Sequence, residues 1–192
     1  MGASLSDGLN FLASTGAALL VIAAVLKLRR PQPGARALEL LHLPASFVVV
    51  RFVALAELLV GAAWLAWPSR ATGASLSATY LIFLGISAAL VRGSDQATPC
   101  GCMGRDDTRI STAHFLYNGA LVLASAGSSG LVAHSAPGLP GHPLLLAVYL
   151  AELGCATWLS YLLLTDFQNA TRPLDQHPQE RWAANRLQAE RR

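Results

Sequence analysis

The stretch from Ile110 to Ala151, ISTAHFLYNGALVLASAGSSGLVAHSAPGLPGHPLLLAVYLA, contains no Asp, Glu, Lys or Arg. The whole chain of 192 residues is 53% hydrophobic and only 13% charged, with a mean hydropathy of +0.43. A soluble domain carries about 25% charged residues, so this chain lacks about half of the charge that a water-facing surface needs. Because lipid cannot satisfy an unpaired backbone, the composition predicts an all-α, polytopic integral membrane protein.

The apolar runs along the chain indicate how many times it crosses the membrane. A helix of about 20 residues spans the ~30 Å of hydrocarbon in a bilayer. Five runs have that length, and they lie at about 9–28, 45–67, 71–91, 112–132 and 143–164. Pro31, Pro33 and Gly34 predict a loop after the first run. We therefore expect one transmembrane domain over residues 1–164 and a polar tail over residues 165–192.

The basic residues indicate orientation, not a nucleic-acid site. The net charge is +3, and most of the 14 Lys and Arg residues lie after the first run, between the third and fourth runs, or in the tail. Cytoplasmic segments of membrane proteins are enriched in Lys and Arg. This distribution predicts an N-terminus outside and a cytoplasmic C-terminus. The first eight residues carry no Lys or Arg, so a cleavable secretory signal is not expected.

Two of the three cysteines lie just before the charge-free stretch, in Pro99-Cys100-Gly101-Cys102-Met103-Gly104. A disulfide across one intervening residue requires a sharp backbone bend, which Gly101 permits. The small ring departs from preferred disulfide geometry and should be reduced easily. We therefore interpret Cys100 and Cys102 as a labile redox pair that needs no other cofactor. The alternatives are inert thiols or part of a metal site, since a soft metal such as copper(I) accepts two thiolates with Met103 nearby.

Glu57 is a second candidate site residue, because it lies near the middle of the second run. A charged carboxylate costs a few kcal/mol or more at that depth, so such residues are often functional. One interpretation is a proton donor or acceptor inside the bundle, and the other is a structural hydrogen-bond partner for another helix. Glu152 in the fifth run is a weaker case of the same kind.

Three further residues lie within the charge-free stretch or shortly after it. His114 falls in the first turn of the fourth predicted helix and would accept a proton from a thiol, help to hold a metal, or simply lie at the interface. Asn118 follows at i+4 on the same face and needs a hydrogen-bond partner within the bundle. Cys155, in the middle of the fifth run, is expected to be a small core residue, and a resolving thiol is the alternative.

Together these residues resemble a known family. The run Cys100 to Gly104, followed by Ile110-Ser111 and then Asn118, resembles the signature of the MauE proteins, which are grouped with DoxX-like redox-associated membrane proteins. Two other segments are similar to family patterns. These are Lys27-Leu-Arg-Arg-Pro31, which is similar to a Lys-Leu-Arg-x-Pro exit from the first helix, and Glu57-Leu-Leu-Val-Gly61, which is similar to a Glu-Leu-x-x-Gly segment. The resemblance covers about residues 9–125, and the chain departs from it at Met103 and Tyr117.

The resemblance implies a four-helix core in the bacterial plasma (inner) membrane, to which this chain adds a fifth transmembrane helix. It also implies thiol-disulfide exchange with a thioredoxin-like partner, in support of disulfide formation or maturation of exported proteins. Cys100 and Cys102 would be the reversible pair, with Glu57 as proton acceptor or anchor and His114 and Asn118 shaping the thiolate site. The alternative function is a non-catalytic membrane assembly factor that binds a soft metal or a partner protein through the same loop. Membrane lipid is an expected partner and nucleic acid is not.

Overall fold

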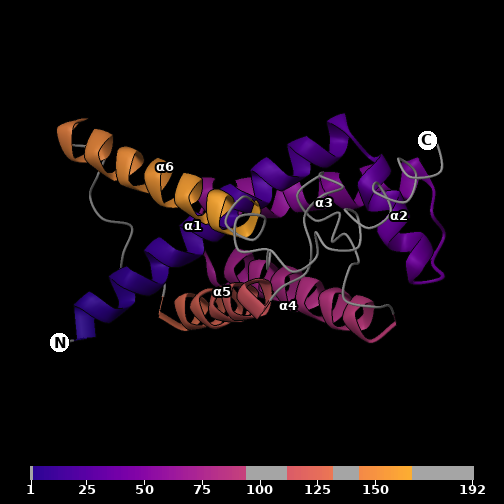
Figure 1. Cartoon of the computed structure of the whole chain (residues 1–192). Helices are drawn as coiled ribbons and strands as arrows, with labels where there is room; N and C mark the ends of the chain where they lie inside the picture. Colours follow the sequence, from indigo (N-terminus) through magenta and orange to yellow (C-terminus); the bar gives the residue numbers. More distant parts are fainter. Residues whose placement is uncertain (1, 94–111, 132–142, 166–192) are drawn as a thin grey trace, which may run out of the picture.

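The computed structural model describes residues 2–93, 112–131 and 143–165, and all regular structure in these ranges is helical. Figure 1 shows helix α1 running through the bundle, with α6 on one side and α4 and α5 on the other. This confirms the all-α prediction. The helices are α1 (Gly2–Arg29), α2 (Gln32–Leu40), α3 (Phe47–Ala66), α4 (Arg70–Gly93), α5 (Thr112–Leu131) and α6 (Pro143–Thr165).

Four of these helices contain segments long and apolar enough to cross a membrane. The segments are Ser6–Arg29, Phe47–Ala66, Arg70–Arg92 and Leu146–Thr165. Helix α5 is not among them, since small and polar residues such as His114, Asn118 and Ser125 interrupt its apolar sequence. It nevertheless packs along α4 and against α1 within the bundle. A multi-pass membrane protein is therefore confirmed, and a fifth crossing stays a prediction.

Helix α1 forms the centre of the core because small side chains allow its neighbours to approach closely. Ala13, Ala17 and Leu20 of α1 pack in one buried cluster with residues of three other helices, which are Trp64, Leu76, Tyr80 and Leu121. The closest approach is between α1 and α3. A Cβ atom added to Gly61 would lie 2.8 Å from the carbonyl oxygen of Ala17. The backbones of these two helices are therefore in contact at that level.

The structure differs from the sequence prediction between the first two long helices. Pro31, Pro33 and Gly34 predict a loop, but residues Gln32–Leu40 form the short helix α2. The prolines lie at its start, where a helix has no intrahelical partner for the backbone N–H and a fixed φ favours helix formation. Pro33 and two alanines face the bundle and are buried. The loop prediction was wrong because its signals also begin helices.

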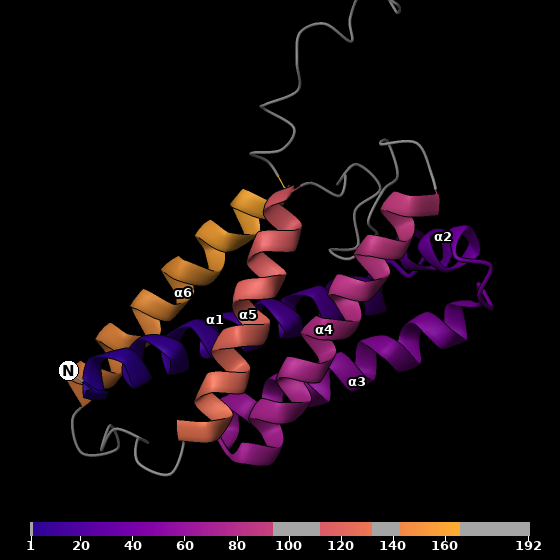
Figure 2. The same ribbon diagram turned by 90° about the horizontal axis from the view of Figure 1, so that it is seen from below.

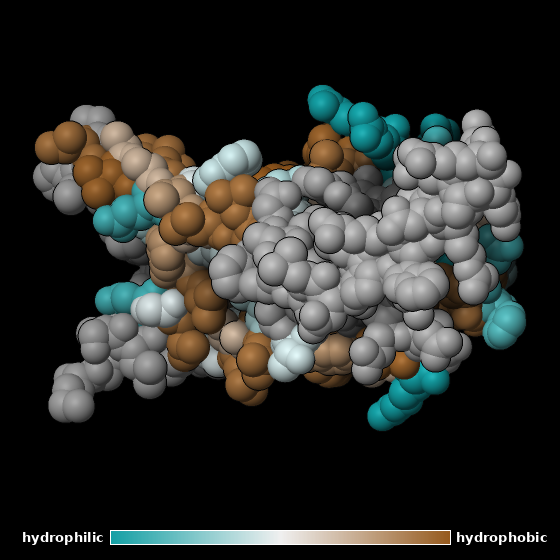
Figure 3. All heavy atoms as spheres, viewed as in Figure 1, coloured by the Kyte–Doolittle hydropathy of each residue, from teal (hydrophilic) through white to brown (hydrophobic). Residues whose placement is uncertain are grey.

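The outward faces of the long helices are apolar, as a lipid environment requires. Leu59 of α3 is 69% exposed and Trp158 of α6 is 61% exposed. Figure 3 shows hydrophobic surface along α6 and hydrophilic surface at the end of α1 that leads into α2. Cys155 also lies on the exposed surface of α6, so the expectation of a core cysteine was wrong. Helix α6 packs chiefly against α1, which leaves most of its circumference, Glu152 included, exposed.

Candidate functional site

Glu57 of α3 is buried inside the bundle and forms an ion pair with Lys27 of α1. The Nζ atom of Lys27 donates a hydrogen bond to Oε1 of Glu57 at 2.5 Å, and the two side chains are 8% and 3% exposed. Side chains of an α-helix tilt toward its N-terminus. Lys27, near the C-terminal end of α1, therefore extends back into the bundle toward Glu57 and does not point out to water.

Aromatic residues of α4 enclose this ion pair on another side. The Lys27 Nζ lies 4.9 Å from the ring centroid of Phe83, which is within the range of a cation–π interaction. Phe83 packs edge-on against Tyr80, with ring centroids 5.9 Å apart. The buried Tyr80 hydroxyl donates a hydrogen bond to the carbonyl oxygen of Gly16 at 2.6 Å. Three helices thus converge on a single cation and its carboxylate partner.

Helix α5 contributes Tyr117 to the core beside the aromatic residues of α4. This side chain packs against the α1 core that contains Tyr80 and also against Leu164 of α6. Tyr117, where the sequence departs from the family pattern, therefore packs in the same core as Tyr80, whose ring contacts Phe83 beside Lys27.

The ion pair leaves one carboxylate oxygen available. Among the described residues, Glu57 Oε2 is buried and has no hydrogen-bond partner, and the same holds for Oγ of Ser87. Ser87 lies one turn beyond Phe83 on the same face of α4. Removing two charges from water costs several kcal/mol for each ion, and the pairing offsets this cost only when the geometry is good. An acceptor atom left free beside such a pair is suited to receive a proton.

Cys100, Gly101 and Cys102 lie outside the residues that the structure describes. The segment that contains them joins the C-terminal end of α4 to the N-terminal end of α5. Figure 2 shows these two helix ends on the same side of the bundle as α2 and the C-terminal ends of α1 and α6. The segment with the predicted thiol pair is therefore attached at the end of the bundle from which Lys27 enters.

His114 and Asn118 lie on α5, close to its attachment to the cysteine segment. His114 is only 3% exposed, so its side chain is buried among the helices of the bundle. Asn118 is half-buried one turn further along the same face. Helix α1 contacts both α3 and α5, so Glu57 and His114 approach the core from different helices.

Sequence reasoning missed Lys27 as a site residue, because a basic residue at the end of an apolar run indicates orientation. The available clue was that two family-like segments contain Lys27 and Glu57. In the structure these segments face each other, because Gly61, one turn after Glu57, lies against Ala17 and Val21 of α1. Each segment thus contributes one charge, and the second also supplies the backbone contact that brings the two charges together.

The metal alternative receives no support from the residues with described positions. No group of three or more His, Cys, Asp or Glu side chains in these residues could hold a metal ion. The Cys100–Cys102 pair, on which that alternative depends, falls outside them, in the gap at 94–111.

Comparison with known proteins identifies the family. Neither the curated proteins nor the solved structures include a match to this chain. Residues 8–134 match the model of the family described as methylamine utilisation protein MauE. The matched region begins in α1 and extends just past α5, and it includes Lys27, Glu57 and the cysteine segment. Since the match covers well over half of the chain, this multi-pass membrane protein belongs to the MauE family.

Proposed function

We propose that this MauE-family protein is a membrane thiol-disulfide redox protein in which Cys100 and Cys102 form a reversible pair. The observation that supports the proposal is the buried Lys27–Glu57 ion pair. Its lysine lies near the C-terminal end of α1, at the end of the bundle where the cysteine segment is attached. Thiol exchange needs groups that take up and release protons. Glu57 has a buried carboxylate oxygen, Oε2, that receives no hydrogen bond from any described residue.

The exchange reaction is balanced in atoms and electrons. A thiolate of a thioredoxin-like partner attacks one sulfur of the Cys100–Cys102 disulfide, which forms a mixed disulfide and releases the other cysteine as a thiolate. The second thiolate of the partner then attacks the mixed disulfide and releases the reduced pair. Two electrons pass from the partner dithiol to the protein, and two protons follow to the new thiols. The reverse sequence oxidises the partner.

The chain's own residues have separate roles in this scheme. Glu57 exchanges protons with the thiol site, and Lys27 holds its carboxylate in place. The N-terminal end of α5 carries a partial positive charge that stabilises a nearby thiolate. His114 and Asn118, in the first two turns of that helix, shape the thiolate site. We place this activity in the bacterial plasma membrane, where it supports the maturation of exported proteins in methylamine utilisation.

Thiol trapping in isolated membranes tests the proposal. The fraction of Cys100 and Cys102 that reacts with a maleimide reagent is measured with and without reduced thioredoxin. We expect thioredoxin to convert both residues from protected to reactive. With the partner in its oxidised, disulfide form, one of the variants Cys100→Ser and Cys102→Ser should retain the attacking thiol and accumulate a mixed disulfide, because the resolving thiol is missing. Cys155→Ser is the matched control, because this thiol lies on the exposed surface of α6 and exchange should continue without it.

Two results would contradict the redox proposal. One is full cellular activity of both Cys100→Ser and Cys102→Ser, with no mixed disulfide. The other is protection of the cysteines that depends on added copper(I) and does not respond to thioredoxin. The second result would identify the protein as an assembly factor that binds a soft metal through the same loop.

A further inference from the structure

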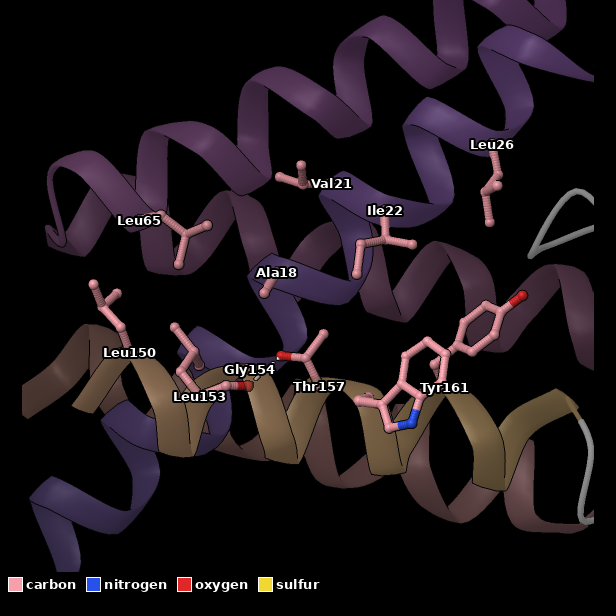
Figure 4. A pocket seen from close by; sticks show the side chains of 11 residues that line it. Ala18, Val21, Ile22, Leu26, Leu65, Leu150, Leu153, Gly154, Thr157 and Tyr161 are labelled. Atoms are coloured by element: carbon pink, nitrogen blue, oxygen red, sulfur yellow. Dashed lines mark hydrogen bonds between the residues drawn. The ribbon is translucent and has the colours of Figure 1, made fainter. Parts of the chain in front are cut away.

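An apolar groove of about 600 Å³ lies between α6 and the pair α1 and α3, and neither Lys27 nor Glu57 lines it. Figure 4 shows side chains from these helices facing into it. Ala18, Ile22 and Leu26 line it from α1, Leu65 lines it from α3, and Gly154 and Tyr161 line it from α6. Almost every group in this lining is a hydrocarbon, so a ligand that fits must present an apolar surface.

The length of the groove suits acyl chains. Ala18 and Leu26 are eight residues apart, which is about 12 Å along a helix and close to half of the ~30 Å hydrocarbon thickness. The groove therefore extends over roughly one leaflet.

Two basic residues lie beyond one end of the groove. Arg29 is the last residue of α1 and Arg30 follows it, three and four residues after Leu26, so both extend the same face beyond the apolar lining. Both are exposed, and neither forms an ion pair among the residues that the structure describes. The hydroxyl group of Tyr161 points toward the Leu26 end of the groove. Two cations and a phenol thus surround the point where an acyl chain would meet its headgroup.

We propose that this groove binds one anionic phospholipid, with its acyl chains against α1 and α6 and its phosphate group at Arg29 and Arg30. Charge complementarity selects the ligand class, because anionic headgroups attract basic residues at the membrane surface. A zwitterionic lipid would make the same apolar contacts but would lack the net negative charge that the two arginines favour.

Native mass spectrometry of the full chain in a mild detergent tests this proposal with phosphatidylglycerol and phosphatidylcholine of identical chains. We expect wild type to retain one phosphatidylglycerol molecule preferentially. Replacing both Arg29 and Arg30 by Gln should weaken that binding by about tenfold or more and leave phosphatidylcholine unchanged. The matched control replaces Arg51 and Arg92, two exposed arginines on α3 and α4, and should retain the preference. Inorganic phosphate alone should not bind.

A second variant pair tests the groove itself. A side chain added at Gly154 meets nothing within 4 Å, and the same is true at Gly85 on α4. Both Gly154→Leu and Gly85→Leu should therefore fold, which thermal unfolding checks. We expect only Gly154→Leu to lose bound phospholipid of both kinds, because only Gly154 lines the groove.

Three outcomes would overturn the proposal. The first is equal retention of the two lipids by wild type. The second is unchanged lipid binding by Gly154→Leu. The third is a dimer mass that disappears in Gly154→Leu, which would show that a second copy of the chain occupies the groove.

Discussion

Lys27 and Glu57, thirty positions apart in the sequence, form an ion pair inside the bundle with a distance of 2.5 Å between Nζ and Oε1. The pair joins α1 to α3, and Phe83 of α4 lies beside the ammonium group. A buried pair of this kind makes each charge depend on the other, since an isolated ion in the interior is strongly destabilising. This dependence leads to the first two predictions.

Removing one charge should cost far more stability than removing both. We expect Lys27→Met or Glu57→Leu alone to lower the free energy of unfolding by about 3–5 kcal/mol, because each leaves an uncompensated buried charge. The double variant should recover most of that loss. Thermal unfolding in detergent and the amount of inserted protein measure the effect. Additive losses in the double variant would show that the two residues do not act as a pair.

Replacing Glu57 by Gln separates proton transfer from packing. Glutamine has nearly the same shape and still accepts a hydrogen bond from Lys27, but it does not take up the proton. We expect Glu57→Gln to lose less stability than Glu57→Leu, since Lys27 keeps a hydrogen-bond acceptor but loses its counter-charge, to insert into membranes, and to slow thiol exchange by about a hundredfold or more. Maleimide trapping as a function of time gives the rate. Exchange at the wild-type rate in this variant would assign Glu57 a structural role only.

The contact between α1 and α3 should tolerate no side chain at Gly61. A Cβ atom there would lie 2.8 Å from the backbone oxygen of Ala17, so the helices must separate to admit it. We expect Gly61→Ala to destabilise the protein by about 1–3 kcal/mol. Gly85→Ala, at an open position of α4, is the matched control and should raise stability by up to about 1 kcal/mol. Equal melting temperatures for the two variants would contradict the close approach of the backbones.

The hydrogen bond from Tyr80 to Gly16 should make a measurable contribution to the attachment of α4 to α1. Tyr80→Phe removes the donor and keeps the ring that packs against Phe83. We expect a loss of about 1 kcal/mol, seen as a lower melting temperature. Tyr149→Phe on α6 keeps its edge-on contact with Phe11 and should change little. A larger effect at Tyr149 than at Tyr80 would argue against this bond.

Orientation in the membrane can be tested with single cysteines in a background without Cys100, Cys102 and Cys155. A cysteine near Arg36 or in the tail after residue 165 should react with an impermeant maleimide only from the cytoplasmic side. One near Pro137, between the fourth and fifth predicted runs, should react only from outside, because the positive-inside distribution predicts that location. Labelling of the tail from outside, with the position near Arg36 still labelled from the cytoplasmic side, would exclude a topology with five crossings.

The positions of the helices follow from local sequence because lipid imposes one rule on every apolar segment. A run of about 20 apolar residues must form a helix wherever it enters the bilayer. The predicted runs therefore agree closely with α1, α3, α4, α5 and α6. Helix α2 was missed because proline signals at a loop and at a helix start are the same. Glu57 is a candidate on sequence grounds alone, because a carboxylate in the middle of an apolar run is costly wherever its helix packs.

Burial and pairing depend on contacts between distant segments, and no local pattern contains them. Lys27 is at the end of an apolar run, where a basic residue equally well marks the membrane surface or turns inward to a partner. Its partner is identifiable only from the tertiary structure, in which Gly61 brings α3 against α1. The burial of His114 and of Cys155 likewise could not be predicted from local sequence. Helix packing buries His114 and exposes Cys155, because the face that a helix presents to its neighbours is decided by how the whole bundle assembles.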